Sequence, residues 1–193
     1  MATGDAKATV EIRRAVPDDW AALRRVRIDA LTEAPYAFGS TLAGTIDRPE
    51  QHWRDRITAW PQFIAWAGSE PVGLAAGLAE HLEDPGRPGN PGPPEDPGRP
   101  GDSGSWQLIS MWVSPQARGQ GIADRLVAAV ADCARADGAE SLTLWVADVS
   151  ARARAFYQRI GFRSTGRRQL VRPEEPDHWE EEQVLDLSRP TSP

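Results

Sequence analysis

Apolar residues recur at intervals of three or four positions in three stretches of the chain, which is the spacing of amphipathic helices. The apolar faces of these predicted helices comprise Trp20, Leu23, Val26, Ala30 and Leu31 in the first, Ile122, Leu126, Val130 and Ala134 in the second, and Ala153, Phe156 and Ile160 in the third. A shorter helix is expected over residues 49–58, with Trp53 on its apolar side. Arg24, Arg25 and Arg27 lie off the apolar face of the first helix, so we expect them in solvent.

Apolar runs bounded by turn residues predict strands between these helices. The predicted strands cover residues 10–16, 62–67, 71–79, 108–113, 141–146, 162–167 and 183–187. Gly73 and Gly77 weaken the strand over 71–79 on propensity, so we expect a bulge or close packing there. The order of elements predicts an α/β (α+β) domain in which a mixed sheet carries helices on both faces.

Residues 82–105 have a different composition from the rest of the chain, dominated by Pro, Gly, Asp, Glu and Arg. The segment Glu-Asp-Pro-Gly-Arg-Pro-Gly occurs twice in it, at 83–89 and 95–101. Such a composition buries too little apolar surface to offset the entropy of ordering, and the segment joins two strands. We therefore expect one domain over 9–189 with a disordered loop insertion, and flexible ends at 1–8 and 190–193.

Charge and composition exclude several classes of partner. The formal net charge of −6 argues against nucleic acid or an anionic membrane, and it weakly suits a cationic amine. No apolar run is long enough to cross a bilayer and the N-terminus lacks a signal-peptide core, so we expect a cytoplasmic protein. His52, His81 and His178 lack the spacing of metal ligands, so no metal is expected.

The candidate chemistry begins where the predicted strand ending at Val113 meets the helix beginning at Ile122. Pro115 ends the strand, and a turn rich in glycine leads into the helix. Such a turn leaves backbone N–H groups unpaired at the positive end of the helix, which is an anion site that commonly holds phosphate. Three phosphate-binding loops have this outline, so the residues that follow the glycines decide between them.

Two of the three loops do not fit. A P-loop requires Lys and Ser/Thr after its second glycine, where this chain has Ile122 and Ala123. A dinucleotide fingerprint requires a small residue where Asp124 stands. The remaining form is Gln/Arg-x-x-Gly-x-Gly/Ala, which Gln116, Gly119 and Gly121 match. This form resembles the pyrophosphate loop of the GCN5-related N-acetyltransferase (GNAT) superfamily, whose members hold acetyl-CoA there.

A second stretch carries the same resemblance. Residues 146–162 are similar to the family signature V-x-x-x-N-x-x-A-x-x-F-Y-x-x-x-G-F, through Val146, Ser150, Ala153, Phe156, Tyr157, Gly161 and Phe162. The resemblance runs from about residue 10 to 187, interrupted by the Pro/Gly-rich loop, and is that of a bacterial member. It implies a mixed, mostly antiparallel sheet of six or seven strands flanked by about four helices.

The resemblance also implies roles for individual residues. The backbone amides that would hold the pyrophosphate belong to Arg118, Gly119, Gln120, Gly121, Ile122 and Ala123. The strand edge at Met111, Trp112 and Val113 would bind the pantetheine arm, and the Val113 amide would stabilise negative charge on the thioester oxygen. Tyr157 would protonate the departing thiolate, while Ser150 and Phe156 would contact the cofactor. The acceptor would lie against Phe38, Ser40 and Glu80.

Two positions depart from the family pattern. Ser150 stands where the family has Asn, and one hydroxyl replaces an amide in contact with the cofactor. Gln107 stands near the position of a glutamate that some members use as general base, and glutamine cannot accept a proton. We therefore expect the acceptor amine to lose its proton through water, steered by Glu80, Ser110 or Asp148.

Three functions remain open from the sequence. The first is an N-acetyltransferase that moves the acetyl group of acetyl-CoA directly to a primary amine of a small molecule or peptide. The second is a catalytically weak acyl-CoA-binding regulatory module of the same fold, which Ser150 and the missing base would explain. The third, a nucleotide-binding protein, is disfavoured because the loop lacks Lys-Ser/Thr. A homodimer is compatible with each of them.

Overall fold

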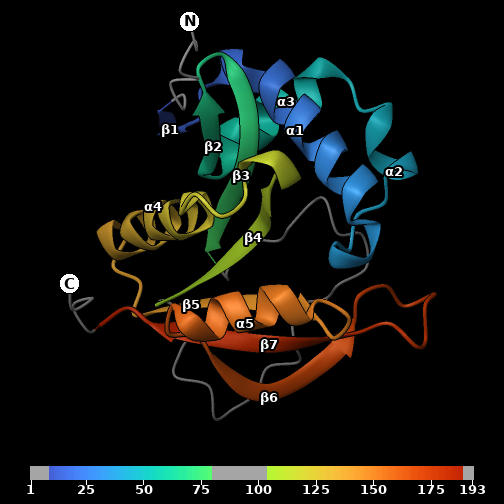
Figure 1. Cartoon of the computed structure of the whole chain (residues 1–193), viewed down its shortest axis with the longest axis vertical. Coiled ribbons are helices and arrows are strands. Elements are labelled where there is room, and N and C mark those ends of the chain that lie inside the picture. The colour runs from blue at the N-terminus through green and yellow to red at the C-terminus, as the bar shows by residue number, and fades with distance from the viewer. Residues whose placement is uncertain (1–8, 80–103, 189–193) are drawn as a thin grey trace, which may run out of the picture.

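A computed structural model describes residues 9–79 and 104–188, which form seven strands and five α-helices (Figure 1). In chain order they are β1 (Val10–Arg14), α1 (Trp20–Glu33), α2 (Ala43–Ile46), α3 (Glu50–Ala59), β2 (Gln62–Ala67), β3 (Glu70–Ala79), β4 (Ser105–Val113), α4 (Ile122–Ala136), β5 (Ser141–Ala147), α5 (Ala151–Arg159), β6 (Arg163–Leu170) and β7 (Trp179–Asp186). The predicted order and fold class are confirmed, with the short helix α2 as an addition. Most of the predicted loop over 82–105, and both chain ends, lie outside the described residues.

The strands form one sheet in the order β1-β2-β3-β4-β5-β7-β6. Every neighbouring pair is antiparallel except β4 and β5, which are parallel. That parallel ladder is short, because Ser105–Gln107 pair with Ser141–Thr143 and the pairing then ends. Beyond this point β5, β7 and β6 run across the direction of β2 and β3 (Figure 1).

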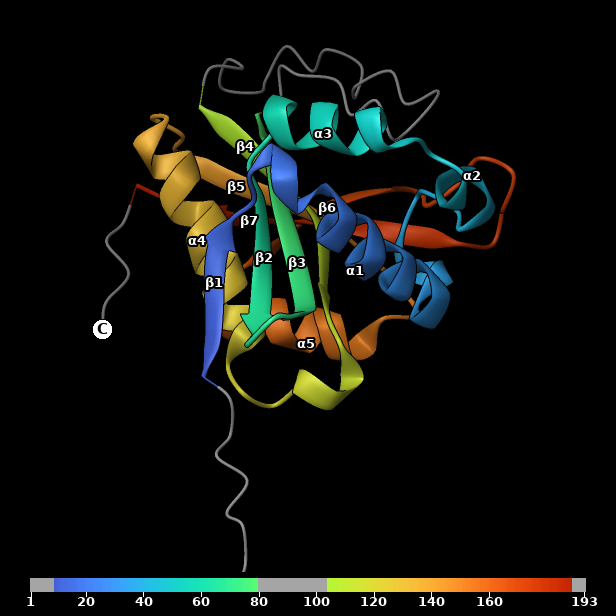
Figure 2. The same ribbon diagram turned by 90° about the horizontal axis from the view of Figure 1, so that it is seen from above.

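Helices cover both faces of the sheet. α4 lies on one side of β1, β2 and β3, and α1 lies on the other (Figure 2). The predicted apolar face of α4 is buried in the first core cluster, since Ile122, Leu126, Val130 and Ala134 are all at most 2% exposed. α1 and α3 pack Leu23, Val26 and Trp53 into a second cluster on the opposite face. Successive residues of β2 belong to opposite clusters, because side chains alternate between the two faces of a strand. Phe63 and Ala65 lie on the α4 side, and Ile64 lies on the α1 side.

Three details differ from the sequence predictions. Arg27 is buried, with its guanidinium 4.5 Å from the centre of the Phe38 ring, so it does not lie in solvent. The first helix begins with a 3-10 turn over Pro17–Asp19 before α1 starts. β7 begins at Trp179, four residues earlier than expected. The reason is that polar side chains of the neighbouring strand β6 bind its glutamates: Arg167 and Thr165 donate hydrogen bonds to Glu182, and Gln169 donates one to Glu180.

Close packing at the two glycines of β3 is confirmed. A Cβ on Gly73 would lie 3.0 Å from the Trp112 carbonyl oxygen. A Cβ on Gly77 would lie 2.7 Å from the Trp106 ring and 3.0 Å from Val130 of α4. The indole N–H of Trp106 donates to Asp137 at the end of α4. Gly77 therefore allows α4 and Trp106 to sit directly on the sheet.

Gly77→Ala should lower the free energy of unfolding by about 1–3 kcal/mol, because a ring held between a helix and a sheet cannot move aside. Urea denaturation followed by tryptophan fluorescence measures this change. Gly104→Ala is the matched control, since its Cβ would meet Glu140 at an ordinary 3.6 Å. Equal stability of the two variants would show that the Trp106 ring yields without cost.

Candidate functional site

The site is organised by an irregularity in β4. Ile109 pairs with Ala76 and Trp112 pairs with Leu74, so Ser110 and Met111 together oppose the single residue Ala75 of β3. This is a β-bulge, which bends a strand and re-aims its side chains. Ser110 has a φ of 58°, and it is the one non-glycine residue with positive φ in the described segments. The bulge follows directly on the end of the ladder with β5.

Beyond the bulge, backbone hydrogen-bonding groups of β4 point toward the side on which β5 no longer pairs with it. The Ser114 amide donates to Val72 of β3 at 2.8 Å, so the preceding pair, Val113 with Gly73, occupies a position without hydrogen bonds to β3. The N–H and C=O of Val113 therefore point away from β3. The Val113 carbonyl accepts a hydrogen bond from the Arg118 Nε–H at 2.9 Å. Trp112 differs, because its backbone pairs with Leu74.

The predicted glycine turn has the geometry of an anion site. Gly119 and Gly121 have φ angles of 77° and 71°, which glycine adopts without the steric cost that a Cβ adds. The first hydrogen bond of α4 runs from the Arg125 amide to the Gly121 carbonyl. The amides of Gly121, Ile122 and Ala123 donate to no described residue, as expected for the first turn of a helix. The Arg118 amide is already used, since it donates to Pro115.

Arg118 also connects the turn to α1. Its guanidinium donates to Glu33 at 2.8 Å, and the Trp112 indole N–H donates to the same Glu33 oxygen at 2.9 Å. The hydrogen bond from Arg118, with that from Trp112, lowers the pKa of Glu33. Sequence reasoning missed Glu33, because it lies 85 positions before Arg118 and no local pattern joins the two.

α5 lies beside the same turn. Arg159 of α5 pairs with Asp124 in the first turn of α4 at 2.7 Å. Ser150 stands at the N-cap position of α5, but its hydroxyl makes no capping hydrogen bond. The apolar face predicted for this helix lies at the margin of the core, since Ala153, Phe156 and Ile160 are only partly buried. Tyr157, which was not assigned to that face, is the buried residue of α5.

Tyr157 lies in a fully apolar setting. Its ring packs edge-on against Phe156 and Phe162, with centroids 5.1 and 5.6 Å away. Burial raises the pKa of Tyr157 well above its ordinary value, so the phenol keeps its proton at physiological pH. Within the described segments the hydroxyl forms no hydrogen bond. Tyr157 belongs to the same packed cluster as Val113.

A pocket of about 460 Å³ opens between the helical segment α1–α3 and the loop that joins β6 to β7. Ser40, one of the residues expected to contact the acceptor, lines it. Phe38 is buried behind the wall, under the Arg27 guanidinium. Glu80 lies outside the described residues. Arg56 joins the pocket to the bulge, because it lines the pocket and donates to the Ser110 hydroxyl at 3.2 Å.

The loop between β6 and β7 is fastened over this pocket by Arg172. Its guanidinium donates to the Phe38 carbonyl at 2.8 Å and forms two hydrogen bonds with Glu175, at 2.7 and 2.6 Å. His178 also contacts Glu175, and the hydrogen bonds from His178 and Arg172 lower the pKa of this carboxyl group. These contacts close the pocket with a loop that sequence reasoning described only as Pro- and Glu-rich.

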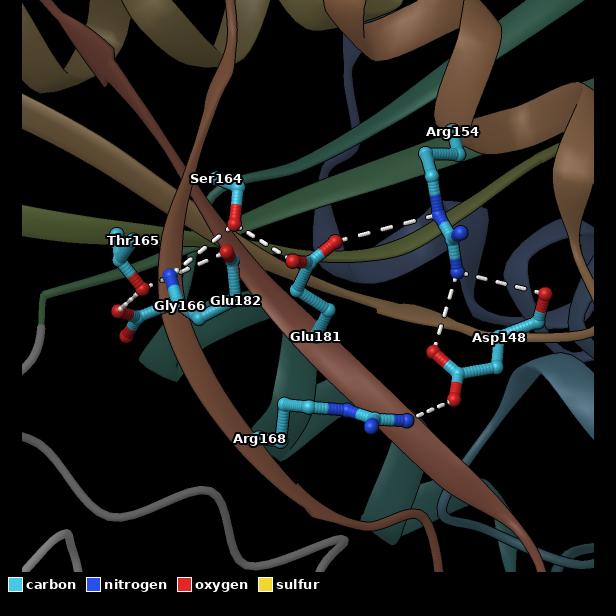
Figure 3. A network of polar contacts seen from close by, with 8 residues as sticks. All are labelled: Asp148, Arg154, Ser164, Thr165, Gly166, Arg168, Glu181 and Glu182. Atoms are coloured by element: carbon cyan, nitrogen blue, oxygen red, sulfur yellow. Dashed lines mark hydrogen bonds and ion pairs between the residues drawn. The ribbon is translucent and has the colours of Figure 1, made fainter.

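Two of the candidate proton acceptors are engaged elsewhere. Asp148 follows β5 and is held between Arg154 of α5 and Arg168 of β6 (Figure 3). Glu181 of β7 lies between Arg154 and Ser164 in the same network. Ser110 accepts a hydrogen bond from Arg56, and a hydroxyl is in any case a weak base. Asp148 and Ser110 thus have other partners, and Glu80, the third candidate, lies outside the described residues, so removal of the acceptor's proton through water stays a prediction.

Among residues 9–79 and 104–188, no three His, Cys, Asp or Glu side chains gather in a way that could bind a metal. Over the same residues, no helix combines the length and apolarity needed to span a membrane.

Solved structures of similar fold come from several bacteria. One is yncA of Salmonella typhimurium, determined with its cofactor acetyl-CoA, which is 18% identical over 96% of this chain and 98% of its own, with a TM-score of 0.70. A GNAT-family acetyltransferase from Streptococcus pneumoniae is 17% identical, over 92% and 99%, with a TM-score of 0.70. A ribosomal-protein-alanine N-acetyltransferase from Brucella melitensis is 22% identical, over 91% and 99%, with a TM-score of 0.65.

A search of curated proteins finds no match to the chain. A family model described as the acetyltransferase (GNAT) family matches residues 26–162, which span the end of α1, the helical part of the pocket lining, the bulged strand, the glycine turn and α5. This segment is well over half of the chain and contains both sequence signatures. The protein therefore belongs to the GNAT family of acetyltransferases.

Proposed function

We propose that this protein is an acetyl-CoA-dependent N-acetyltransferase that acts on a primary amine by direct transfer. The observation that carries the proposal is the position of the β4 edge. The edge leads from the bulge at Ser110 to Val113, just before the glycine turn. At the bulge, Arg56 connects it to the pocket. A donor and an acceptor could thus approach one strand from two directions.

The residues present fit acetyl-CoA as cosubstrate. Three amides at the start of α4 lack partners among the described residues, and Gly119 and Gly121, both at positive φ, place no side chain at their positions in the turn. Both features suit a pyrophosphate at a helix N-terminus. The β4 edge at Met111 and Val113 would pair with the amide groups of a pantetheine arm, as an added strand does. Phe156, partly exposed on α5, would cover the arm.

Acetyl-CoA supplies an activated acetyl group, so that the new N–C bond forms as the C–S bond breaks and the amine gives up a proton. The Val113 amide would donate a hydrogen bond to the thioester oxygen, where negative charge develops. Tyr157 would donate its proton to the departing sulfur. Because burial raises its pKa, the phenol keeps its proton at physiological pH and is available as the general acid.

Gly121→Val should raise the dissociation constant of acetyl-CoA at least tenfold, about 1.4 kcal/mol, because its side chain would project where the pyrophosphate binds and strain the turn. Isothermal titration measures the constant. Gly138→Val is the matched control: Gly138 lies at the opposite end of α4, has a φ of 84°, and likewise has no atom within 4 Å of an added Cβ. If both folded variants bind acetyl-CoA equally well, the turn is not the binding site.

Tyr157→Phe should lower kcat at least tenfold while acetyl-CoA affinity and thermal stability stay close to those of the parent. The ring and its packing remain, and only the hydroxyl is lost; general acids contribute about 10²–10⁴ in rate. Since burial raises the pKa of Tyr157, any decline of kcat that it governs should begin above about pH 10 and vanish in the variant.

Tyr36→Phe provides the control, because Tyr36 is the other of the two tyrosines and is 44% exposed. Survival of both kcat and the high-pH decline in Tyr157→Phe would make Tyr157 structural. A protein that binds acetyl-CoA but acetylates no amine would instead be the regulatory module.

A further inference from the structure

Arginines outnumber carboxylates in the described lining of the pocket. The lining includes the guanidinium groups of Arg27, Arg48, Arg56 and Arg172, against one carboxylate, Glu174. Arg172 is balanced by Glu175 through two hydrogen bonds. Arg27 and Arg56 are engaged in other interactions, among them the contact of Arg27 with the Phe38 ring and the hydrogen bond from Arg56 to the Ser110 hydroxyl.

Three of the basic residues recur at one spacing. Arg48, His52 and Arg56 are four positions apart, so they follow one side of α3 and of the turn that precedes it, and all three line the pocket. Burial, together with the positive charges of Arg48 and Arg56, lowers the pKa of His52. The lowered pKa thus reflects, besides burial, the positive potential that the two arginines create at the ring.

Arg48 is the best placed of these groups to meet a ligand. Its Nε donates to the Gly44 carbonyl at 2.9 Å, which fixes the direction of the side chain. Its two terminal nitrogens donate to no group in the described segments, and no described carboxylate lies within ion-pair distance. A guanidinium fork oriented in this way matches the two oxygens of a carboxylate.

The volume of the pocket sets the size of the ligand. About 460 Å³ is within the usual range of small-molecule sites, roughly 300–1,000 Å³. The loop fastened by Arg172 limits the pocket on one side, and Arg56 connects the other side to the Ser110 bulge. The pocket lining thus includes both Arg48 and Arg56, the residue that contacts the bulge of β4.

We propose that the acceptor is a small amine that also carries a carboxylate, as an amino acid does, and that Arg48 binds this carboxylate. This inference rests on the proposed N-acetyltransferase function and names the substrate class of the same site. The overall negative charge of the chain, which by itself weakly suits a cationic amine, does not extend into the pocket. A polyamine or another amine without an anionic group would meet positive charge there.

The test compares the twenty L-amino acids, each paired with its C-terminal amide, and putrescine as a diamine without a carboxylate. Isothermal titration in the presence of coenzyme A, which allows no transfer, measures binding, and thiol release from acetyl-CoA measures turnover. At least one amino acid should bind at least tenfold more tightly than its own amide. The amine of the amide is less basic than that of the acid, so a larger fraction of it is unprotonated and reactive at neutral pH. Faster turnover of the acid would therefore reflect binding of the carboxylate.

Three variants make the test specific for Arg48. Arg48→Gln should weaken binding of that amino acid at least tenfold and leave its amide unchanged, while Arg48→Lys should retain most of the preference because it keeps the charge. Arg24→Gln is the matched control: Arg24 also donates to a backbone carbonyl, that of Ile46, but does not line the pocket. It should bind like the parent.

The outcomes separate this inference from the proposed function. Equal binding of acids and amides, stronger binding of putrescine, no binding across the panel, or a preference that survives in Arg48→Gln would each overturn the carboxylate site. Transfer to putrescine alone would overturn it while supporting the transferase. Carboxylate-dependent binding without any thiol release would support the site and count against the transferase.

Discussion

The structure depends on the place where β4 and β5 stop pairing. Three residues of each strand form a parallel ladder, and the bulge at Ser110 and Met111 then turns β4 away. The sheet is thereby divided into β1–β4 and β5–β7, which share only this short joint. This division leaves a length of β4 edge that is not paired with β5. Its backbone groups need hydrogen-bond partners, which an extended ligand could supply.

Several long-range polar contacts hold elements around that edge. Glu33 joins the end of α1 to Arg118, Asp124 joins α4 to Arg159 of α5, and Arg172 joins the loop after β6 to the segment after α1. The first two contacts are partly exposed ion pairs, which contribute little to stability, about 0–1 kcal/mol each. All three join segments that are distant in sequence.

The sequence predicted most elements because their burial follows helical or strand periodicity. The face of α4 from Ile122 to Ala134 is an example, and the glycine turn was located from local spacing alone. What could not be predicted depends on tertiary partners. The acidic start of β7 is stabilised by Arg167 and Thr165 of β6, and Arg27 is buried because Phe38 lies beneath it. Of the pocket lining, Ser40 was singled out from the sequence, whereas Arg48, His52 and Arg56 were missed although their four-residue spacing was visible.

The cations of the pocket are arginines, and this has a chemical consequence for an acyl-transfer enzyme. The chain has a single lysine, Lys7, near its N-terminus and outside the described residues. A lysine near a thioester would offer a competing amine, whereas a guanidinium stays protonated and is not acylated under the same conditions. Positive charge can therefore be placed next to a reactive acyl donor without giving that donor a nucleophile within the protein itself.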